Sequence, residues 1–493
     1  MCRSSHSAVR TLIALGALIA STSAHATEWL PPGDARLRSD LKFLADAGEI
    51  DIPLSSWPMP VADVDRALAL READDSSGAV EAALARVAQA VERAKQHGAI
   101  DLRVTAGRPP LVQTFDQTPR EEGEAQASWS WQSGGFSGVV SAVGVVDPLD
   151  GQSARPDGTY VAYDFNRWQV RAGWVDRYWG STADGSLILS TNARPVPTLS
   201  LERTVSNAPE SRWLRWFGPW RAGMFIGQME NHRDDVDKPV FFGMHVDMKP
   251  RENIDLAFFR TAELCGRGRI CDASTFWKML IGHDNIGINV SAADQPGNQM
   301  GGIDMRWAHP IGHAPYALYT HIIGEDGKNG IPVKALKTSG IESTFSHGDS
   351  GYTQVRLEYT DIKCASSTPA KQFNCAYRNN VFNYRYRGRI IGSSLDNDTA
   401  MWSLGVDHVD GSGMSLSTAL RFADVNRGGA PDPRHAISPT PLKLWEVEGR
   451  LKRDYSFGTM DLAVIVDRTT DRLTDRSETA IRGFLTWSKR FGK

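Results

Sequence analysis

The sequence predicts an all-β transmembrane antiparallel barrel that follows an export signal and an N-terminal α-helical bundle. Three observations predict it. The first 26 residues have the composition of a cleavable signal, the stretch after them has a helical hydrophobic period, and apolar and polar residues alternate from about residue 124 onward. We therefore expect a signal peptide (1–26), a periplasmic helical domain (27–123) and an outer-membrane barrel (124–493).

The export signal has a basic start, a short apolar run and a small-residue end. Arg3 and Arg10 are basic, residues 11–20 form the apolar run, and Ala24 and Ala26 fit the positions before a cleavage site. The run is about half of the roughly 20 residues that a membrane-spanning helix needs. We expect the mature chain to begin at Thr27 and to reach the cell envelope.

Charge and hydropathy narrow the class of protein. The signal removes two of the 55 basic residues and none of the 58 acidic ones, so the mature net charge is −5 with histidine neutral. This mild acidic balance argues against nucleic acid as a partner. The mean hydropathy is −0.34, and no later uncharged apolar run reaches the ~18 residues of a transmembrane helix. A soluble periplasmic protein and a barrel with a polar lumen both fit these values.

Residues 32–98 are expected to form about three helices. Asp34 is a plausible N-cap for the first helix and Gly48 a plausible stop. Apolar residues recur at helical spacing on one face of each of two segments: Leu37, Leu41 and Leu44, then Val80, Leu84, Val87 and Val91.

Beyond residue 124, strands with one apolar and one charged face follow one another. In one example, Val355, Leu357 and Tyr359 alternate with Arg356 and Glu358. Full charges on one face favour a barrel with a lipid-facing outside and a wet or salt-bridged inside, and a soluble β-protein is the alternative. The 370 residues from 124 to 493 suffice for about 16 to 20 strands of ~10 residues with their connections.

The lengths of the connections indicate which end of the barrel is periplasmic, and the cysteines lie in the long connections. Turns near residues 250–253 and 310–315 are short, whereas the stretches 265–298, 361–380 and 423–440 are long and polar, as periplasmic turns and outer loops are expected to be. The signal carries away one cysteine. The remaining four suggest two loop-closing disulfides, Cys265 with Cys271 and Cys364 with Cys375, although four cysteines allow three connectivities. No spacing supports a zinc site, so we expect no metal.

Several stretches together resemble the Wzi capsule-assembly family of outer-membrane proteins. They are Trp29-Leu-Pro-Pro-Gly-Asp, Trp57-Pro-Met-Pro, Phe217-Gly-Pro-Trp, Gly227-Gln-Met-Glu, Ile323-Gly-Glu-Asp and Tyr386-Arg-Gly-Arg-Ile-Ile-Gly. The resemblance implies an 18-stranded barrel, a periplasmic helical bundle over its inner mouth, and a lectin-like role in attaching capsular polysaccharide to the cell surface. It supplies no short motif that identifies the sugar-binding residues.

A run of arginines is the most concentrated candidate for polysaccharide binding. At strand spacing Arg385, Arg387 and Arg389 share one face and Tyr384 and Tyr386 the other, so the arginines are expected to form a cationic ladder. Guanidinium groups pair with carboxylates, which suggests an acidic surface polysaccharide as partner. The alternative is that the ladder pairs with acids inside the barrel, because a crowded lumen needs its charges neutralised.

Two further sets of polar residues are candidates. A neutralising charge network in the lumen is expected, although the same residues would line a pore if water separated them; its members are Glu230, Arg233, Asp304, Arg306, Glu325 and Asp326. The long loops offer additional sugar contacts: Asp272, Asp284 and Asn298.

The remaining motifs favour structural or lipid roles. Trp213, Trp216 and Trp220 suit an interfacial girdle better than sugar stacking. The chain has no nucleophile, metalloprotease, phosphate-binding or dinucleotide-binding motif, so we expect neither an enzyme nor a cofactor. The prediction is a polysaccharide-attaching outer-membrane lectin that contacts membrane lipids and, through its helices, export machinery. A diffusion channel and a barrel hydrolase are the rivals.

Overall fold

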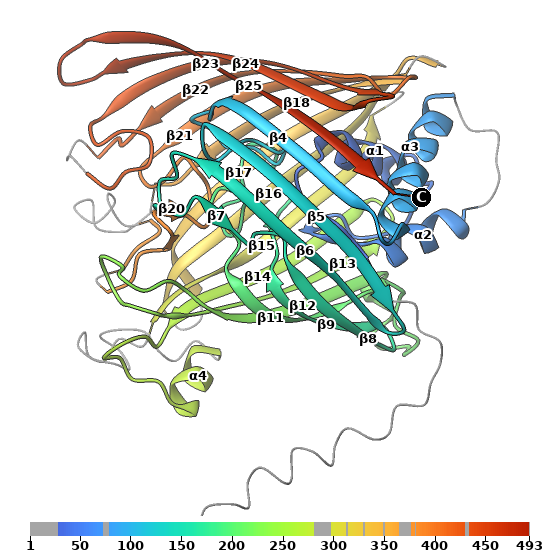
Figure 1. Ribbon diagram of the computed structural model, residues 1–493, viewed down its shortest axis with the longest axis horizontal. Coiled ribbons are helices and arrows are strands. Elements are labelled where there is room, and N and C mark those ends of the chain that lie inside the picture. Colours follow the sequence, from blue (N-terminus) through green and yellow to red (C-terminus); the bar gives the residue numbers. More distant parts are fainter. Residues whose placement is uncertain are drawn as a thin grey trace, which may run out of the picture.

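The computed structural model describes residues 28–71, 78–280, 297–311, 314–328, 331–348, 351–363, 376–379, 381–428 and 433–492. In these residues a closed antiparallel barrel carries a helical bundle at one end (Figure 1). The helices are α1 (Ala35–Asp46), α2 (Val61–Ala69), α3 (Gly78–Lys95), α4 (Ala273–Leu280) and the short 3-10 helix η1 (Arg215–Phe217). None of the helices in these ranges is both long and apolar enough to cross a bilayer.

Eighteen strands of the described residues complete the barrel. They are β4 (Ile100–Arg108), β5 (Gly123–Ser133), β6 (Phe136–Val146), β8 (Tyr160–Phe165), β9 (Trp168–Trp174), β11 (Pro197–Arg203), β12 (Trp220–Gln228), β13 (Val240–Arg251), β14 (Ile254–Leu264), β15 (Gly297–Ile311), β16 (Ala314–Lys328), β17 (Ile331–Ser346), β18 (Gly351–Asp361), β21 (Ala400–Asp410), β22 (Ser415–Val425), β23 (Leu442–Tyr455), β24 (Gly458–Asp471) and β25 (Ser477–Phe491). The two-residue strand β7 (Ala154–Arg155) pairs beside β8 on β6. The pairs β25 with β4 and β9 with β11 close the circuit, and the predicted barrel is confirmed.

Short strand pairs tie other segments together. They are β1 (Trp29–Leu30) with β3 (Met59–Pro60), β2 (Ser56–Trp57) with β10 (Tyr178–Trp179), and β19 (Arg385–Tyr386) with β20 (Arg389–Ile390). The second pair joins the helical domain to residues 175–196, which connect β9 to β11. A further contact within the same region is the Phe115 amide donating to the Ala183 carbonyl at 2.8 Å. Residues 109–122 and 175–196 therefore fold together against the helical domain.

Alternation along the strands separates an apolar outside from a polar inside. On β24, Leu462 and Val464 are exposed, whereas Asp461 and Asp467 are buried. Because successive side chains of a strand point to opposite faces, the exposed apolar residues form the lipid-facing surface and the buried acids face the lumen.

The barrel has two different ends. We call the end that carries α1, α2 and α3 the helix end, and the opposite one the loop end; in Figure 1 the C-terminus lies at the helix end. Tight connections such as Arg251–Ile254 and Tyr455–Gly458 lie at the helix end, whereas most long connections, including the one that carries α4, lie at the loop end. This is the asymmetry that the sequence predicted.

The N-terminal region follows the helical prediction, with one difference in its extent. Asp34 caps α1 by accepting the Leu37 amide at 3.1 Å, and the apolar residues predicted on the two helical faces are buried in one core. The barrel, however, begins before the expected boundary at residue 124, because β4 pairs with β25 and β5. Ile100 and Val104 are exposed on β4 while Thr105 is buried, which is the alternation of a barrel strand.

Candidate functional site

Helix α1 carries charged residues into the barrel. Its apolar residue Leu41 packs in the bundle core, which leaves the opposite face of the helix to polar contacts. Arg38 is buried and donates to the carbonyls of Gly180 at 2.7 Å and Thr182 at 2.8 Å. The guanidinium of Arg38 also lies 4.1 Å from the ring centroid of Phe115. One arginine therefore joins α1 to both segments that fold against it.

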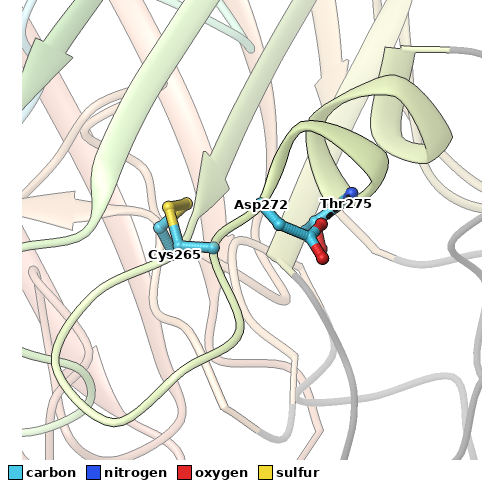
Figure 2. Close-up of a disulfide and its surroundings, with 4 residues drawn as sticks. Cys265, Asp272 and Thr275 are labelled. Atoms are coloured by element: carbon cyan, nitrogen blue, oxygen red, sulfur yellow. Dashed lines mark hydrogen bonds between the residues drawn. A yellow bond between two sulfur atoms is a disulfide. The ribbon is translucent and has the colours of Figure 1, made fainter. Parts of the chain in front are cut away.

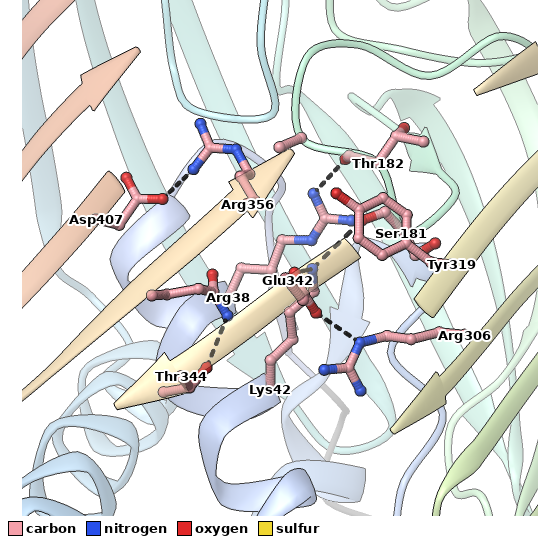
Figure 3. A network of polar contacts seen from close by, with 12 residues as sticks. Arg38, Lys42, Ser181, Thr182, Arg306, Tyr319, Glu342, Thr344, Arg356 and Asp407 are labelled. Carbon is pink, nitrogen blue, oxygen red and sulfur yellow. Dashed lines mark hydrogen bonds and ion pairs between the residues drawn. The ribbon is translucent and has the colours of Figure 1, made fainter. Parts of the chain in front are cut away.

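Arg306 joins the same helix to the barrel wall. Its guanidinium lies 2.6 Å from the Asp46 carboxylate at the end of α1 and 2.7 Å from Glu342 on the strand β17. Glu342 also pairs with Lys42 of α1 at 3.0 Å (Figure 3). Lys42, Arg306 and Glu342 are buried, so these ion pairs fill the lumen and connect α1 to two strands.

Asp304, two residues before Arg306, binds Ser181 of the segment 175–196 through hydrogen bonds and, among the described residues, does not pair with an arginine or lysine. Its carboxylate accepts the amide and the hydroxyl of Ser181 at distances between 2.7 and 2.9 Å. His321 lies 3.9 Å away on β16. The structure thus places both predicted lumen residues of β15 inside, where they bind α1 and the segment 175–196.

A second buried cluster lies farther around the same wall, on β22 and β23. Arg421 contacts Asp184 at 2.9 Å and Glu446 and Glu448 at 2.7 Å each. Arg421 and Glu446 come from β22 and β23, and Asp184 from the segment 175–196. This cluster was not predicted from the sequence, because no local pattern brings Asp184 to Arg421 across 237 positions.

A small polar cavity remains between α1 and the wall. It measures about 70 Å³, and its lining includes Arg38, Lys42, Asp116, Glu342 and Arg421. Since a water occupies about 30 Å³ of liquid, the cavity holds a few waters and no sugar or solute of that size. The cavity is therefore hydration space between α1 and the wall.

Asp116, which lines this cavity from the segment 109–122, has a perturbed pKa. Burial raises the pKa of its carboxyl to about 6, and the charge of Arg450, 3.0 Å away, opposes that rise. The carboxyl also accepts the amide of Ala35 at the start of α1 at 3.3 Å. Its ionisation thus affects the contact between α1 and the lumen segment.

Arg233 forms a third cluster close to the loop end. It contacts Asp235 at 2.6 Å, Glu230 at 3.3 Å and Glu263 at 3.6 Å. Arg233 and Glu230 follow β12, so the structure brings these two predicted network residues together in the connection at its end. The side chains of the predicted members Glu325 and Asp326 lie outside the described residues.

The predicted arginine ladder is wrong. Arg385 and Arg389 belong to two short strands of a hairpin, β19 and β20, and Arg387 and Gly388 form the turn between them. Both turn residues have positive φ, 52° and 82°, which is the conformation of a two-residue hairpin turn. The three arginines therefore do not share one strand face, because the chain reverses at the middle one.

The arginines of this hairpin have different partners. Arg385 pairs with Asp396 at 2.5 Å, and Arg389 lies 3.4 Å from Glu121 and donates to the Arg120 carbonyl. Arg387 forms no ion pair within the described part of the chain, and its guanidinium lies 5.7 Å from the Tyr386 ring centroid. The alternative interpretation, pairing with internal acids, therefore fits Arg385 and Arg389 and leaves Arg387 at the turn.

The three loop candidates have three different placements. Asp272 accepts the Thr275 amide at 2.6 Å as the cap of α4, and this hydrogen bond lowers the pKa of its carboxyl. Asn298 is not in a loop as expected, since it is buried on β15 opposite Glu263. Asp284 lies outside the described residues.

One of the two expected disulfides is present. Cys265 and Cys271 are bonded and close the start of the connection that carries α4 (Figure 2). Cys265 packs with Met279 of α4 and with Leu264, so the bridge holds that helix against the end of β14. Cys364 and Cys375 lie outside the described residues.

Fold and lumen define the chain as a transmembrane β-barrel with an occupied lumen. Sequence comparison then gives the family: the model described as capsule assembly protein Wzi matches residues 92–463, about three quarters of the chain. The chain belongs to the Wzi capsule-assembly family of outer-membrane barrels, and the resemblance found in its sequence is confirmed.

A curated protein and a solved structure are similar to this chain. An uncharacterized 55.8 kDa protein in the cps region of Klebsiella pneumoniae is 31% identical over 346 residues, which cover 69% of this chain and 66% of that protein. The second is the solved structure of Wzi, an outer-membrane protein involved in group 1 capsule assembly in Escherichia coli and described as a carbohydrate-binding β-barrel. It is 23% identical, with a TM-score of 0.81, and the match covers 94% of this chain and 100% of that one.

Proposed function

We propose that this protein is a lectin-like component of capsule assembly that attaches capsular or extracellular polysaccharide to the cell surface. Membership of the Wzi family supports this function, as does the carbohydrate binding described for the Escherichia coli protein. We further propose that the signal peptide is cleaved, that the helix end faces the periplasm and can dock export machinery, and that the protein is not an enzyme.

The occupied lumen is the observation that carries the proposal. Helix α1, the segments 109–122 and 175–196 and the buried ion pairs of Arg306 and Arg421 fill the interior, which leaves the loop end as the surface for a polymer. A diffusion channel, the rival function, needs an open lumen. We expect no steady ionic current when the purified protein is inserted into planar lipid bilayers. Steady open currents would favour the channel.

The hairpin turn supplies a candidate cationic contact for an acidic polymer. Arg387 is half-buried and forms no ion pair in the described residues, whereas Arg385 and Arg389 already have partners. Charge-assisted contacts of a guanidinium with carboxylates suit weak, repeated binding along a polysaccharide. Asp272 and the disulfide-held α4 lie at the same end of the barrel and can add polar contacts.

Deletion of the gene tests the function in the cell. Polymer synthesis is expected to continue while surface-attached polymer is released into the medium, because attachment and not synthesis is lost. Unchanged retention of every surface polysaccharide would contradict the proposal.

Binding to a panel of acidic and neutral polysaccharides at two salt concentrations tests the contact. Arg387→Gln is expected to weaken binding of an acidic polymer by about two- to fivefold per site at low salt, with less effect at high salt. Arg453→Gln is the matched control, since Arg453 also lies over a tyrosine ring, 5.3 Å from that of Tyr455, but at the helix end. Equal loss in both variants would rule out a specific role for the hairpin.

A further inference from the structure

The connection between β11 and β12 contains two of the tryptophans that the sequence suggested for an interfacial girdle, and its surface is unusual. It spans residues 204–219 at the helix end, where most connections are short, and it contains η1. Trp213, Leu214 and Trp216 are 86%, 47% and 60% exposed. Large apolar side chains that cluster in solvent mark a surface for a partner or for a membrane.

Contacts hold this connection at the base of the barrel wall. At its start, the Ser206 amide donates to Asp63 of α2 at 2.8 Å. At its end, the Lys249 amide donates to the Pro219 carbonyl at 2.8 Å, and Gly218, with a φ of 63°, leaves no room for a side chain against the Lys249 carbonyl. The exposed residues are therefore presented beside the wall from two fixed points.

The apolar surface of the connection continues the lipid-facing surface of β12. Trp220 begins that strand in the same phase as Met224 and Ile226, which are exposed and point outward. From the middle of β12 toward the helix end, the outward side chains thus change from aliphatic residues to tryptophans. This order is typical of the boundary between the hydrocarbon core and the headgroup layer.

Basic residues accompany the tryptophans. Arg212 and Arg215 are exposed in the same connection, which also contains the acid Glu210, and neither arginine forms an ion pair within the described ranges. Nearby, the Arg203 guanidinium lies 4.1 Å from the Trp220 ring centroid. Arginines at headgroup depth can bind lipid phosphates through paired, charge-assisted hydrogen bonds.

We propose that residues 210–217 are a membrane-surface anchor: Trp213, Leu214 and Trp216 enter the interfacial layer of the leaflet at the helix end, and Arg212 and Arg215 bind the phosphates of anionic phospholipids. The bilayer, and not a protein, is the occupant, because the apolar surface is continuous with the lipid-facing wall and basic groups flank it. The same connection and α2 border a cleft of about 510 Å³ lined by Leu70, Arg66 and Ser206. By holding this connection, the anchor would fix the helical bundle relative to the membrane.

Hydrogen–deuterium exchange of the full chain in lipid nanodiscs tests the basic contacts. Exchange of residues 210–217 is expected to be slower when phosphatidylglycerol is mixed into phosphatidylcholine, by about fivefold for each arginine at low salt. The double variant Arg212→Gln/Arg215→Gln should lose that difference. Arg267→Gln, at an exposed arginine of the loop end, is the control and should keep it.

Quenching of tryptophan fluorescence by brominated phosphatidylcholine tests whether Trp213 and Trp216 enter the bilayer. Trp213→Ser/Trp216→Ser is expected to lower the quenchable fluorescence, whereas Trp277→Ser, which removes an exposed tryptophan of α4, should not. Equal exchange in both lipid mixtures, or unchanged quenching in the double tryptophan variant, would overturn the proposal. So would protection that depends on added periplasmic protein and not on lipid. None of these readouts involves polysaccharide, so the anchor and the attachment function can fail separately.

Discussion

Removing the charge of Glu342 is expected to loosen α1 in the lumen. Glu342→Gln keeps the shape of the side chain but leaves Lys42 without its carboxylate partner and Arg306 with Asp46 alone. Breaking a buried ion pair by removing one partner costs about 3–5 kcal/mol, because the other charge stays desolvated. Glu342 is 2% exposed, so this full range applies.

The matched control acts on the same helix at an exposed pair. Arg36 of α1 contacts Asp454 at 2.9 Å, with the Asp454 side chain 33% exposed. Solvent screens such a pair, and its loss through Asp454→Asn is expected to cost about 1 kcal/mol or less. The two variants thus remove one carboxylate charge each from contacts of α1 and differ in burial.

Hydrogen–deuterium exchange of the α1 amides in the detergent-solubilised full chain measures the difference. Local opening of α1 should become roughly a hundredfold or more frequent in Glu342→Gln and about fivefold or less in Asp454→Asn, since 1.4 kcal/mol corresponds to a factor of ten. Exchange in β24 reports whether the wall itself has changed. If the two variants accelerate α1 exchange equally, burial does not determine the strength of these contacts and the reasoning is refuted.

Three other changes probe the second cluster, the disulfide and the cap of α4. Arg421→Met leaves three carboxylates buried and should lower stability to denaturant by about 3–5 kcal/mol, with partial recovery when Glu446→Gln is added; an unchanged midpoint would contradict the assigned contacts. Cys265→Ser/Cys271→Ser removes the disulfide that closes a short loop, and the loss of this constraint should cost about 2 kcal/mol. Amide hydrogen–deuterium exchange should therefore become faster in residues 265–280 and not in the barrel strands. The hydrogen bond from the α4 backbone lowers the pKa of Asp272, so its capping contribution is present above the ordinary value of about 4 and is lost as the pH falls through the lowered pKa. Asp272→Asn, which can still cap, should abolish this pH dependence of α4 exchange, and a persistent dependence would assign it to another group.

The barrel was predictable because the alternation of apolar and polar residues in a strand is a local pattern of neighbouring residues. The same rule that identified Val355 to Tyr359 as a strand also applies to β4, where Ile100 and Val104 face outward. That strand was assigned to the helical domain because a long polar connection separates it from β5. Periodicity identifies a strand but does not state which neighbour it pairs with, and β4 pairs with the last strand of the chain.

The candidate site was less predictable, for two physical reasons. First, strand spacing was assumed through Arg387, although the Gly388 beside it permits the positive φ of a turn. Second, the partners of lumen charges lie far apart in sequence: Arg306 meets Asp46, 260 residues away, and Arg421 meets Asp184, 237 residues away. A strand face can be inferred from local pattern, whereas register around a closed barrel and the path of a lumen segment depend on the whole fold.

The position of the hairpin at the loop end is coupled to α1 through backbone contacts. Arg38 of α1 holds the carbonyls of residues 180 and 182, and farther along the same segment the Ser190 amide donates to the Ile391 carbonyl at 2.9 Å. The Asn192 side chain donates to the Ile390 carbonyl at 2.8 Å, and Ile390 is the last residue of β20. A shift of α1 would leave Lys42 and Arg306 buried without their carboxylate partners, which is costly, so these contacts favour the observed position of the helix. The lumen segment 175–196 thus links α1 to the hairpin whose turn carries Arg387, at the surface that we propose binds polysaccharide.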